Sequence, residues 1–411
     1  DPFGLDRNPT LERQYALWDK VVAENIFIVC QTPMAKSITR RTLCGFRNAK
    51  VNAKYFKDLV SILKRTPQVF VDQVSSAKFW GQKGNGKMKF EAIVGNPPYQ
   101  QMDGGNGVSA GPLFQYFVEG AKALAPSYLS LIIPARWYAG GKGLDDFRAK
   151  MLADKSISYL VDFESSKECF PSVNIAGGLC YFLWEGEHHG MCKFVNRKNG
   201  KDFALTRSLN EFDILVRSNY GVSIIHKIVE SGVEVIAKHA YPRNPFGFQT
   251  NYRGRDKKQA GDIEILTSKG FQYVERAQVS KNAGIIDSYK VLIGRLVPSN
   301  GELDIRPGEK YKVITDTRII GPGQINTETY LDIGVFKTKE EADNFEHYLH
   351  LKFPRFLLRQ AISSLNVTRE CFKFVPFEDF THRWSDEELY QKYNLTDDEI
   401  STIESMIREM K

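Results

Sequence analysis

The sequence lacks long apolar runs, is poor in cysteine and has no initiator methionine. Its most apolar stretch, around Tyr128 to Ala135, is far shorter than the roughly 20 residues that span a bilayer, so we expect no membrane partner. The 6 cysteines show no paired spacing, which excludes a disulfide scaffold. Together with the absence of a signal peptide, this predicts a cytoplasmic protein.

The composition is that of a well-packed protein. Hydrophobic residues make up 42% of the chain, aromatic residues 12% and charged residues 26%, which excludes a disordered or collagen-like chain. A length of 411 residues exceeds one ordinary core, so two or three domains are expected.

The net charge of +7 is unevenly distributed. Residues 1–95 carry 16 basic and 8 acidic side chains, a net charge of +8, and residues 241–320 carry 14 and 9, a net charge of +5. The last 36 residues, 376–411, carry 4 and 10, a net charge of −6. Two basic blocks on either side of a neutral one favour a polyanionic partner, although ordinary solvated faces would give a similar count.

Up to about residue 200, apolar runs typical of buried strands alternate with helical segments. The expected strands are 25–30, 90–95, 128–133, 159–163 and 178–184, with a short one at Val69 to Val71 that ends at Asp72. The expected helices are 35–43, 113–124 and 144–153. This alternation predicts an α/β domain whose parallel or mixed sheet is covered on both faces.

The second half of the chain has a different character. Residues 241–335 are rich in glycine, proline, tyrosine and basic residues, with short strands expected at 290–294, 312–314 and 330–335. Helices are expected at 340–352, 356–362 and 394–410, and Ser385 followed by three acids predicts another helix start. We therefore predict domains at 1–205 and 206–411.

The strongest signal is a proline-containing motif that follows a predicted strand. The strand 90–95 runs into Asn96-Pro97-Pro98-Tyr99, and two consecutive prolines cannot continue a ladder. Such a tetrapeptide should occur by chance in roughly one chain of this size per thousand. Because ligands sit at the carboxyl ends of strands in α/β sheets, we interpret the motif as a binding site rather than a rigid turn.

The motif suits the amino group of a nucleobase. That amine is a poor nucleophile because its lone pair is delocalised into the ring. The Asn96 side-chain oxygen and the Pro97 carbonyl could accept its two hydrogens and favour a pyramidal nitrogen, while Pro98 stiffens the loop. Tyr99 offers a face for an unstacked base, an interaction of about 1–3 kcal/mol. A base in duplex DNA would have to be flipped out to reach it.

These residues resemble a known family. Asn96-Pro97-Pro98-Tyr99 resembles the catalytic motif of adenine-specific, amino-group DNA methyltransferases. The segment 130–143, which contains Arg136 and Lys142, is similar to the strand and loop next to that site in restriction–modification methylases. Cys169-Phe170-Pro171-Ser172-Val173 resembles the segment whose phenylalanine packs against the flipped adenine. Segments similar to the end of bacterial adenine methylases occur at 327–330, 374–376 and 384–390.

The resemblance implies a function and a fold. The reaction would be transfer of a methyl group from S-adenosylmethionine to adenine N6 in double-stranded DNA, with the base between Tyr99 and Phe170 and with no metal or covalent intermediate. Residues 1–205 would form a Rossmann-like methyltransferase sheet with helices on both faces. Residues 206–411 would form a mixed α+β target-recognition domain with a helical C-terminal part. A restriction endonuclease subunit or domain would lie outside this chain.

The donor site is where the sequence departs from the family pattern. Family members carry Asp-Pro-x-x-Gly-x-Gly after a first strand, whereas this chain offers Asp1-Pro2-Phe3-Gly4 with no strand before it. Asp6 could hold the ribose hydroxyls, or the donor could lie after strand 25–30, where Gln31 replaces the expected acid. Asp72 would either contact the adenine of the donor or cap a turn. Either the first strand and glycine loop are missing, which we favour, or the donor site is impaired.

Basic side chains of two regions are candidates for DNA contact. Arg40 and Arg41 would contact phosphates or merely solvate a helix. Side chains able to read base edges or phosphates occur in the second domain. The DNA-binding candidates are Arg40, Arg41, Arg136, Lys142, Arg253, Arg255, Lys257 and Lys258. The group Cys180, His188, His189 and Cys192 does not have a recognised metal-ligand spacing, so no metal is expected.

Two other functions share parts of this evidence. The same motif would serve methylation of a glutamine amide in a protein, but the long basic second half argues against that reading. The broken glycine motif would also fit a DNA-binding methylase relative that has lost its donor site.

Overall fold

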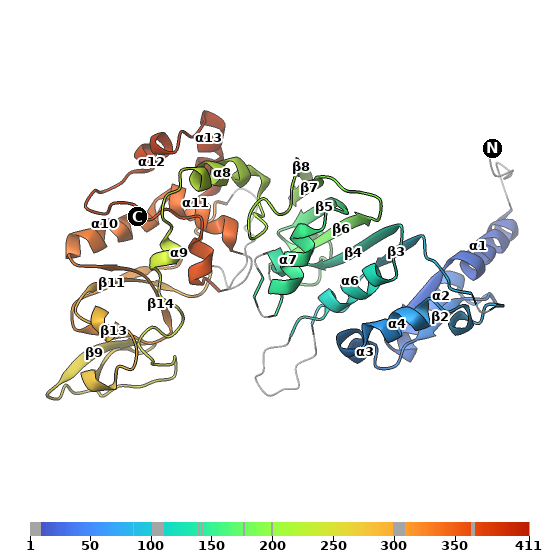
Figure 1. Cartoon of the computed structure of the whole chain (residues 1–411), viewed down its shortest axis with the longest axis horizontal. Coiled ribbons are helices and arrows are strands. Elements are labelled where there is room, and N and C mark those ends of the chain that lie inside the picture. The colour runs from blue at the N-terminus through green and yellow to red at the C-terminus, as the bar shows by residue number, and fades with distance from the viewer. Residues whose placement is uncertain are drawn as a thin grey trace. The chain divides into compact units, whose positions relative to one another are not determined.

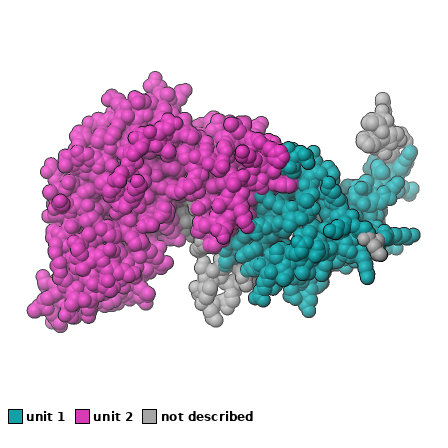
Figure 2. Space-filling view, in the orientation of Figure 1, with its two compact units in different colours: residues 1–131, 185–187 teal, residues 132–184, 188–411 magenta. Residues whose placement is uncertain are grey.

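The computed structural model describes residues 10–84, 86–100, 111–138, 140–141, 143–175, 177–198, 200–298, 309–362 and 366–410. The chain forms two compact units (Figure 2). Unit 1 comprises residues 1–131 and 185–187, and unit 2 comprises residues 132–184 and 188–411. The division falls within a strand of the α/β part, so the predicted domain boundary at residue 205 stays a prediction.

Unit 1 is mainly helical, with short parallel strands (Figure 1). Its helices are α1 (Leu11–Asn25), α2 (Pro33–Cys44), α3 (Leu59–Arg65), α4 (Pro67–Val74), α5 (Ala77–Trp80) and α6 (Phe114–Ala123). Its strands are β1 (Phe27–Cys30), β2 (Asn52–Tyr55) and β3 (Ala92–Gly95), followed by the first residues of β4 (Tyr128–Pro134). β1 pairs in parallel with β2, and β3 pairs in parallel with β4.

A cluster of aromatic and aliphatic side chains holds unit 1 together. Phe56, Leu63, Phe70 and Trp80 are buried at its centre, and Phe27 of β1 packs edge-on against Trp80 with ring centroids 5.2 Å apart. β3 lies at the margin of this core, since three of its four residues are exposed. The sequence therefore predicted β1, β3, α2 and α6 correctly to within a few residues at each end.

The strand predicted at Val69 to Val71 is wrong, because these residues lie inside helix α4. Pro67 occupies the first turn, where its missing N–H costs nothing. Phe70 and Val74, four residues apart, both face the core, which is helical spacing. Asp72 consequently lies on a helix and not at the end of a strand.

Unit 2 contains the larger sheet. Its elements run from the end of β4 through η1 (Ala135–Tyr138), α7 (Asp145–Ala153), β5 (Ile157–Phe163), η2 (Ser166–Glu168), β6 (Leu179–Glu185), β7 (Cys192–Lys198) and β8 (Lys201–Arg207). The strand order is β4-β6-β5-β7-β8. β5 runs antiparallel to β6 and parallel to β7, and β7 runs antiparallel to β8. The α/β fold with a mixed sheet is thus confirmed.

The C-terminal part of unit 2 combines two small sheets with helices. The helices are η3 (Asn219–Gly221), α8 (Val222–Glu230), α9 (Ile236–His239), η4 (Arg276–Gln278), η5 (Ala283–Ile285), α10 (Lys339–His350), α11 (Lys352–Ala361), η7 (Arg369–Phe372), α12 (Asp386–Lys392) and α13 (Asp397–Met406). The strands are β9 (Asp262–Thr267), β10 (Gly270–Glu275), β11 (Tyr289–Gly294), β12 (Thr317–Ile320), β13 (Gln324–Asn326) and β14 (Tyr330–Phe336). Their order is β10-β9-β13 and β12-β11-β14.

Most predicted elements of this part are confirmed, and one is wrong. β11, β14 and α10 match the predictions closely, whereas α11 begins at Lys352, before the predicted segment 356–362. Ser385 caps the start of α12 and forms a capping box with Glu388. The strand predicted at 312–314 is absent from these described residues. Val313 has a φ of 71°, which breaks an extended backbone. None of the described helices combines the length and the apolar character needed to cross a bilayer.

Candidate functional site

The Asn-Pro-Pro-Tyr motif lies where the sequence predicted it, at the carboxyl end of a strand. β3 ends at Gly95, and Asn96 follows it as an exposed residue, whereas Pro97 is buried. Tyr99 is half-buried, and its carbonyl oxygen accepts a hydrogen bond of 3.1 Å from the Leu113 N–H. This bond ties the motif to the start of α6.

Two further contacts fix the local geometry. Gly95 precedes the motif, and a Cβ atom there would lie 3.2 Å from the Leu131 side chain, so β3 and β4 approach closely. The Gln115 side chain donates to the Pro112 carbonyl at 3.1 Å and anchors the first turn of α6. The motif therefore joins a strand and a helix whose positions are both constrained.

Phe170 lies in the connection between β5 and β6. Its N–H donates to the Ser166 carbonyl at 2.8 Å, and its own carbonyl accepts from the Val173 N–H at 2.9 Å. The Ser166 hydroxyl donates to the Val173 carbonyl and accepts from the Ile175 N–H, both at 2.8 Å. Phe170 is half-buried in this tight loop. It belongs to unit 2 and Tyr99 to unit 1, so the sandwich of a base between them stays a prediction.

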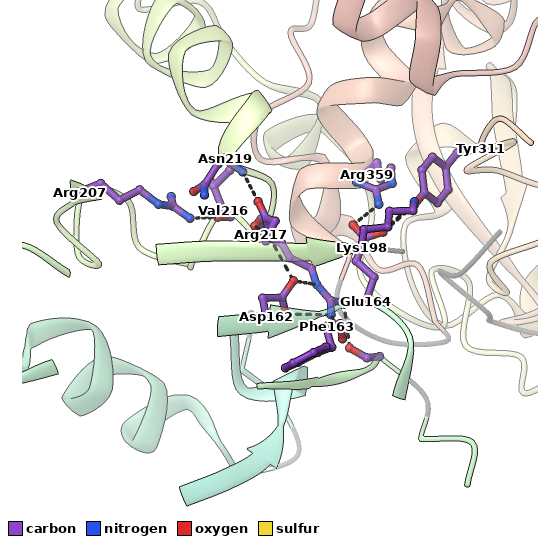
Figure 3. Close-up of polar contacts among 12 residues, drawn as sticks. Asp162, Phe163, Glu164, Lys198, Arg207, Val216, Arg217, Asn219, Tyr311 and Arg359 are labelled. Atoms are coloured by element: carbon purple, nitrogen blue, oxygen red, sulfur yellow. Dashed lines mark hydrogen bonds and ion pairs between the residues drawn. The ribbon is translucent and has the colours of Figure 1, made fainter. Parts of the chain in front are cut away.

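Two carboxylates at the carboxyl end of β5 are bound by arginines from later in the chain (Figure 3). Asp162 is fully buried and accepts two hydrogen bonds of 2.9 Å from Arg217. Glu164 accepts from Arg359 and from the Tyr311 hydroxyl, the latter at 2.5 Å. Burial alone would raise the pKa of Glu164, but Arg359 and other nearby cations hold it well below its usual range.

The sequence analysis missed this cluster, although a signal was present. Arg217 directly follows the apolar residues 214–216, and Arg359 directly follows the apolar residues 356–358. A lone arginine in an apolar segment is unusual, because a buried charge needs a partner. The partners, however, lie 55 and 195 positions away and cannot be identified from local pattern.

The residues predicted to bind the methyl donor are mostly outside the described part of the chain. Asp1, Gly4 and Asp6 fall among residues that the structure does not describe. Asp72 is exposed on α4 and accepts a hydrogen bond of 2.8 Å from the Gln68 side chain. Gln31 follows β1 directly and is exposed. The predicted donor site therefore stays a prediction.

The predicted DNA-binding residues lie in three places, and Lys142 is outside the described residues. Arg40 and Arg41 are exposed on α2. Arg136 lies in η1, where burial lowers the pKa of its guanidinium.

The remaining four candidates share the segment before β9. Arg253, Lys257 and Lys258 are exposed there. Arg255 donates to Asp262 at 2.7 Å and to Gln259 at 2.8 Å, so its guanidinium is engaged within the fold. Contact of these side chains with DNA stays a prediction.

The histidine and cysteine group considered as a metal site has other surroundings. Burial raises the pKa of Cys180 and of Cys192 to about 12, so both remain thiols. A ring nitrogen of His188 lies 3.2 Å from the Met191 carbonyl. Across the described ranges, no group of three or more potential ligands is placed to hold a metal ion.

One part of the chain is similar to a known protein family. Residues 24–170 match the model of the Eco57I restriction-modification methylase family. An "uncharacterized adenine-specific methylase" of Mycoplasma pneumoniae is 32% identical over 191 residues, which is 45% of this chain and 44% of that protein. The chain thus spans less than half the length of this relative.

Similar solved structures belong to restriction–modification systems. The type IIL restriction-modification enzyme MmeI in complex with DNA has a TM-score of 0.43 at 10% identity, covering 83% of this chain and 52% of that one. The methyltransferase subunit of a type I system from Streptococcus thermophilus has a TM-score of 0.29 at 12% identity, covering 50% and 42%. The family match confirms, for residues 24–170, the resemblance to restriction–modification methylases that the sequence predicted.

Proposed function

We propose that this chain carries the base-binding and DNA-recognition parts of an adenine-specific DNA methyltransferase of a restriction–modification system. The methyl donor would be S-adenosylmethionine and the acceptor adenine N6. The observation that carries the proposal is Asn-Pro-Pro-Tyr at the carboxyl end of β3, inside the segment that matches the methylase family. A ligand at this edge of an α/β sheet is expected on general grounds.

The residues of the motif have separate tasks in this proposal. The Asn96 oxygen and the Pro97 carbonyl accept hydrogen bonds from the adenine amino group and localise the lone pair of the nitrogen. That lone pair would attack the methyl carbon in line, while the bond from this carbon to the donor sulfur breaks and the donor leaves as the thioether. The methylated nitrogen would then lose one of its protons to solvent. Tyr99 stacks on the flipped base, and Phe170 covers its other face. Catalysis then consists of positioning and of polarising the amine. The parallel pairing of β3 with β4 supports a Rossmann-like arrangement around this motif.

The DNA contacts of the proposal come from the two basic blocks. Arg40 and Arg41 on α2, Arg136, Lys142, and the segment with Arg253, Arg255, Lys257 and Lys258 would neutralise phosphates or read bases. Residues 206–411 would form the recognition domain. Three of the residues proposed to bind the donor, Asp1, Gly4 and Asp6, lie outside the described residues.

The proposal is tested by incubating the full-length protein that contains this chain with labelled S-adenosylmethionine and unmethylated duplex DNA. We expect label in N6-methyladenine, and we expect Asn96→Ala to lower the rate about 100-fold or more, as removal of one polar group at a reacting centre commonly does. Gln100→Ala, a change in the exposed residue after the motif, is the matched control and should retain the rate.

Each rival function predicts a different result. Label in a protein glutamine and none in DNA would favour the glutamine methyltransferase. Salt-sensitive DNA binding without any transfer would favour a non-catalytic relative, for which the position of Asp72 inside helix α4 is the favouring observation.

A further inference from the structure

The connection between β5 and β6 is held at both ends by charged side chains. It begins at Glu164, directly after β5, and ends at Gly178, directly before β6. Phe170 lies in its middle. Figure 3 shows the arginines and carboxylates that surround the start of this connection.

Arg217 binds the far end of the connection to the strand at which it began. Its guanidinium makes the two bonds of 2.9 Å to Asp162. It also donates to the Phe163 carbonyl at 3.0 Å and to the Gly177 carbonyl at 2.8 Å. One planar group therefore contacts the last two residues of β5 and the residue just before Gly178, which only the multiple donors of arginine allow.

The backbone at Gly178 lies too close to its neighbours to leave space for a side chain. Gly178 has a φ of +76°, and a Cβ atom there would lie 2.1 Å from the Phe163 carbonyl oxygen and 2.7 Å from an Arg217 nitrogen. Arg217 is itself fixed, because the Asn196 side chain of β7 donates to its carbonyl at 2.8 Å. The two ends of the connection are thus held against each other.

Glu164, the first residue of the connection, is bound to the C-terminal part of the same unit. Its carboxylate accepts from Arg359 on α11 and from the Tyr311 hydroxyl, with Lys198 at 3.4 Å. The Arg359 guanidinium lies 3.8 Å from the centre of the Tyr311 ring. Arg359 has only 5% of its side chain exposed. This contact joins the start of the connection to a helix whose described residues from Phe353 to Ala361 are all buried.

We propose that Arg217 and Arg359 are positioning residues for Phe170. They clamp both ends of the connection, and the Ser166 hydroxyl braces its interior, so that the Phe170 ring is held ready to cover a flipped base. The proposal deepens the proposed function and rests on it for the role of Phe170. Buried ion pairs are weak evidence for stability, since apolar groups of similar size often serve as well. An apolar pair, however, could not bind the Gly177 carbonyl.

The clamp is tested first without any enzymatic readout, by hydrogen exchange of the whole chain. Arg217→Lys keeps the charge next to Asp162 but loses the fork that reaches Gly177. We expect the N–H groups of Phe170, Val173 and Ile175 to exchange at least about tenfold faster, with those of β5 and β7 changing less than twofold. Arg276→Lys is the matched control, because Arg276 forms a two-bond pair with Asp287 at an exposed site.

A second variant covers the case in which Arg217→Lys does not fold. Asp162→Leu combined with Arg217→Met replaces the pair by apolar side chains and leaves no buried charge unpaired. If the folded double variant keeps the parental exchange rates in the connection, the clamp is refuted. Equal acceleration throughout the sheet would also refute it, because that result would show a purely structural role.

The link to Phe170 is tested by methyl transfer to duplex DNA, with the full-length protein that contains this chain as the parent. We expect Arg217→Lys to lower kcat about tenfold with KM values for DNA and donor within twofold, and to add nothing to the loss caused by Phe170→Ala. Losses that multiply in the double variant would show that Arg217 does not act through Phe170. If the exchange result holds but the parent transfers no methyl groups, the clamp stands and the proposed function fails.

Discussion

Two buried charged side chains, Lys290 and Asp332, stand out at the residue scale in the C-terminal part. Both are fully buried. The Lys290 ammonium donates to the carbonyls of Ser288 at 2.7 Å and Ile286 at 2.8 Å, and burial lowers its pKa to about 8. The Asp332 carboxylate accepts a hydrogen bond of 3.0 Å from the Asn326 side chain, and burial raises the pKa of Asp332 to about 7. Carbonyl contacts satisfy the lysine, whereas the carboxyl favours its neutral form.

Asp332 should make the protein less stable as the pH rises. Its folded pKa of about 7 lies above the ordinary value of 3.8, so the folded state keeps a proton that the unfolded state loses. The contribution of Asp332 to the free energy of unfolding is fully present below pH 4. It is lost as the pH rises to about 7, and the loss is on the order of 4 kcal/mol at most. We expect Asp332→Asn to remove this decline, measured as free energy of unfolding in urea at pH 5 and pH 8.

The control for Asp332 is Asp316→Asn, since the Asp316 side chain is 92% exposed. It should leave the difference between pH 5 and pH 8 unchanged. A parental decline that persists in Asp332→Asn would show that another group causes it.

Tyr99 should act through its ring. If it stacks on a flipped adenine, Tyr99→Ala should lower kcat/KM for methyl transfer by the equivalent of about 1–3 kcal/mol. Tyr99→Phe keeps the ring and should stay within a few-fold of the parent. Equal losses in both variants would contradict a stacking role.

At the scale of elements, α11 begins without a cap of its own. Its N-cap residue, Leu351, has no side chain that could accept a hydrogen bond. The carboxylate of Asp386 in α12 accepts from the N–H groups of Lys352 at 2.9 Å and Phe353 at 2.8 Å instead. A residue more than 30 positions away thus satisfies the first turn of the helix that carries Arg359.

Loss of this distant cap should destabilise the protein measurably. Asp386→Ala leaves two partly buried donors unpaired, and we expect a loss of about 1–2 kcal/mol in the free energy of unfolding. Glu387→Ala changes the exposed neighbour on the same helix and should cost less than about 0.5 kcal/mol. Urea denaturation of both variants measures the difference, and equal losses would rule out the capping role.

At the scale of the whole molecule, the uneven charge is the main clue to a partner. The +8 of residues 1–95 and the +5 of residues 241–320 precede and follow the Asn-Pro-Pro-Tyr motif in sequence. Several of these cations are engaged within the fold, as Arg255 is with Asp262, so the count overstates what is free to meet DNA.

The exposed lysines before β9 should contribute to binding through phosphates. Lys257→Glu combined with Lys258→Glu should weaken binding to any duplex and reduce the salt dependence of log K by about 2, roughly one for each lost phosphate contact. Lys155→Glu with Lys201→Glu makes the same charge change at other exposed positions. Titrating a labelled duplex at several salt concentrations measures the salt dependence of log K for both double variants. Identical slopes in the two would exclude a specific role for the segment before β9.

Local sequence predicted about half of the described strands and helices, among them the strand that precedes the Asn-Pro-Pro-Tyr motif. Apolar runs identified β3 and β4, paired prolines set the end of β3, and Ser385 with its acids marked the start of α12. These features depend on neighbours within a few residues, so pattern is sufficient. Where two patterns compete, as at Val69 to Val71, the proline at the start of a turn decided for a helix.

The tertiary structure alone decided which distant groups meet. The sequence by itself determined that an Asn-Pro-Pro-Tyr motif ends a strand of an α/β fold. It could not show that Arg217 binds Asp162 or that Arg359 binds Glu164, because a long-range pair depends on strand order and helix packing rather than on spacing. A buried charge is stable only where the fold places a partner beside it, and that placement depends on the whole folded chain.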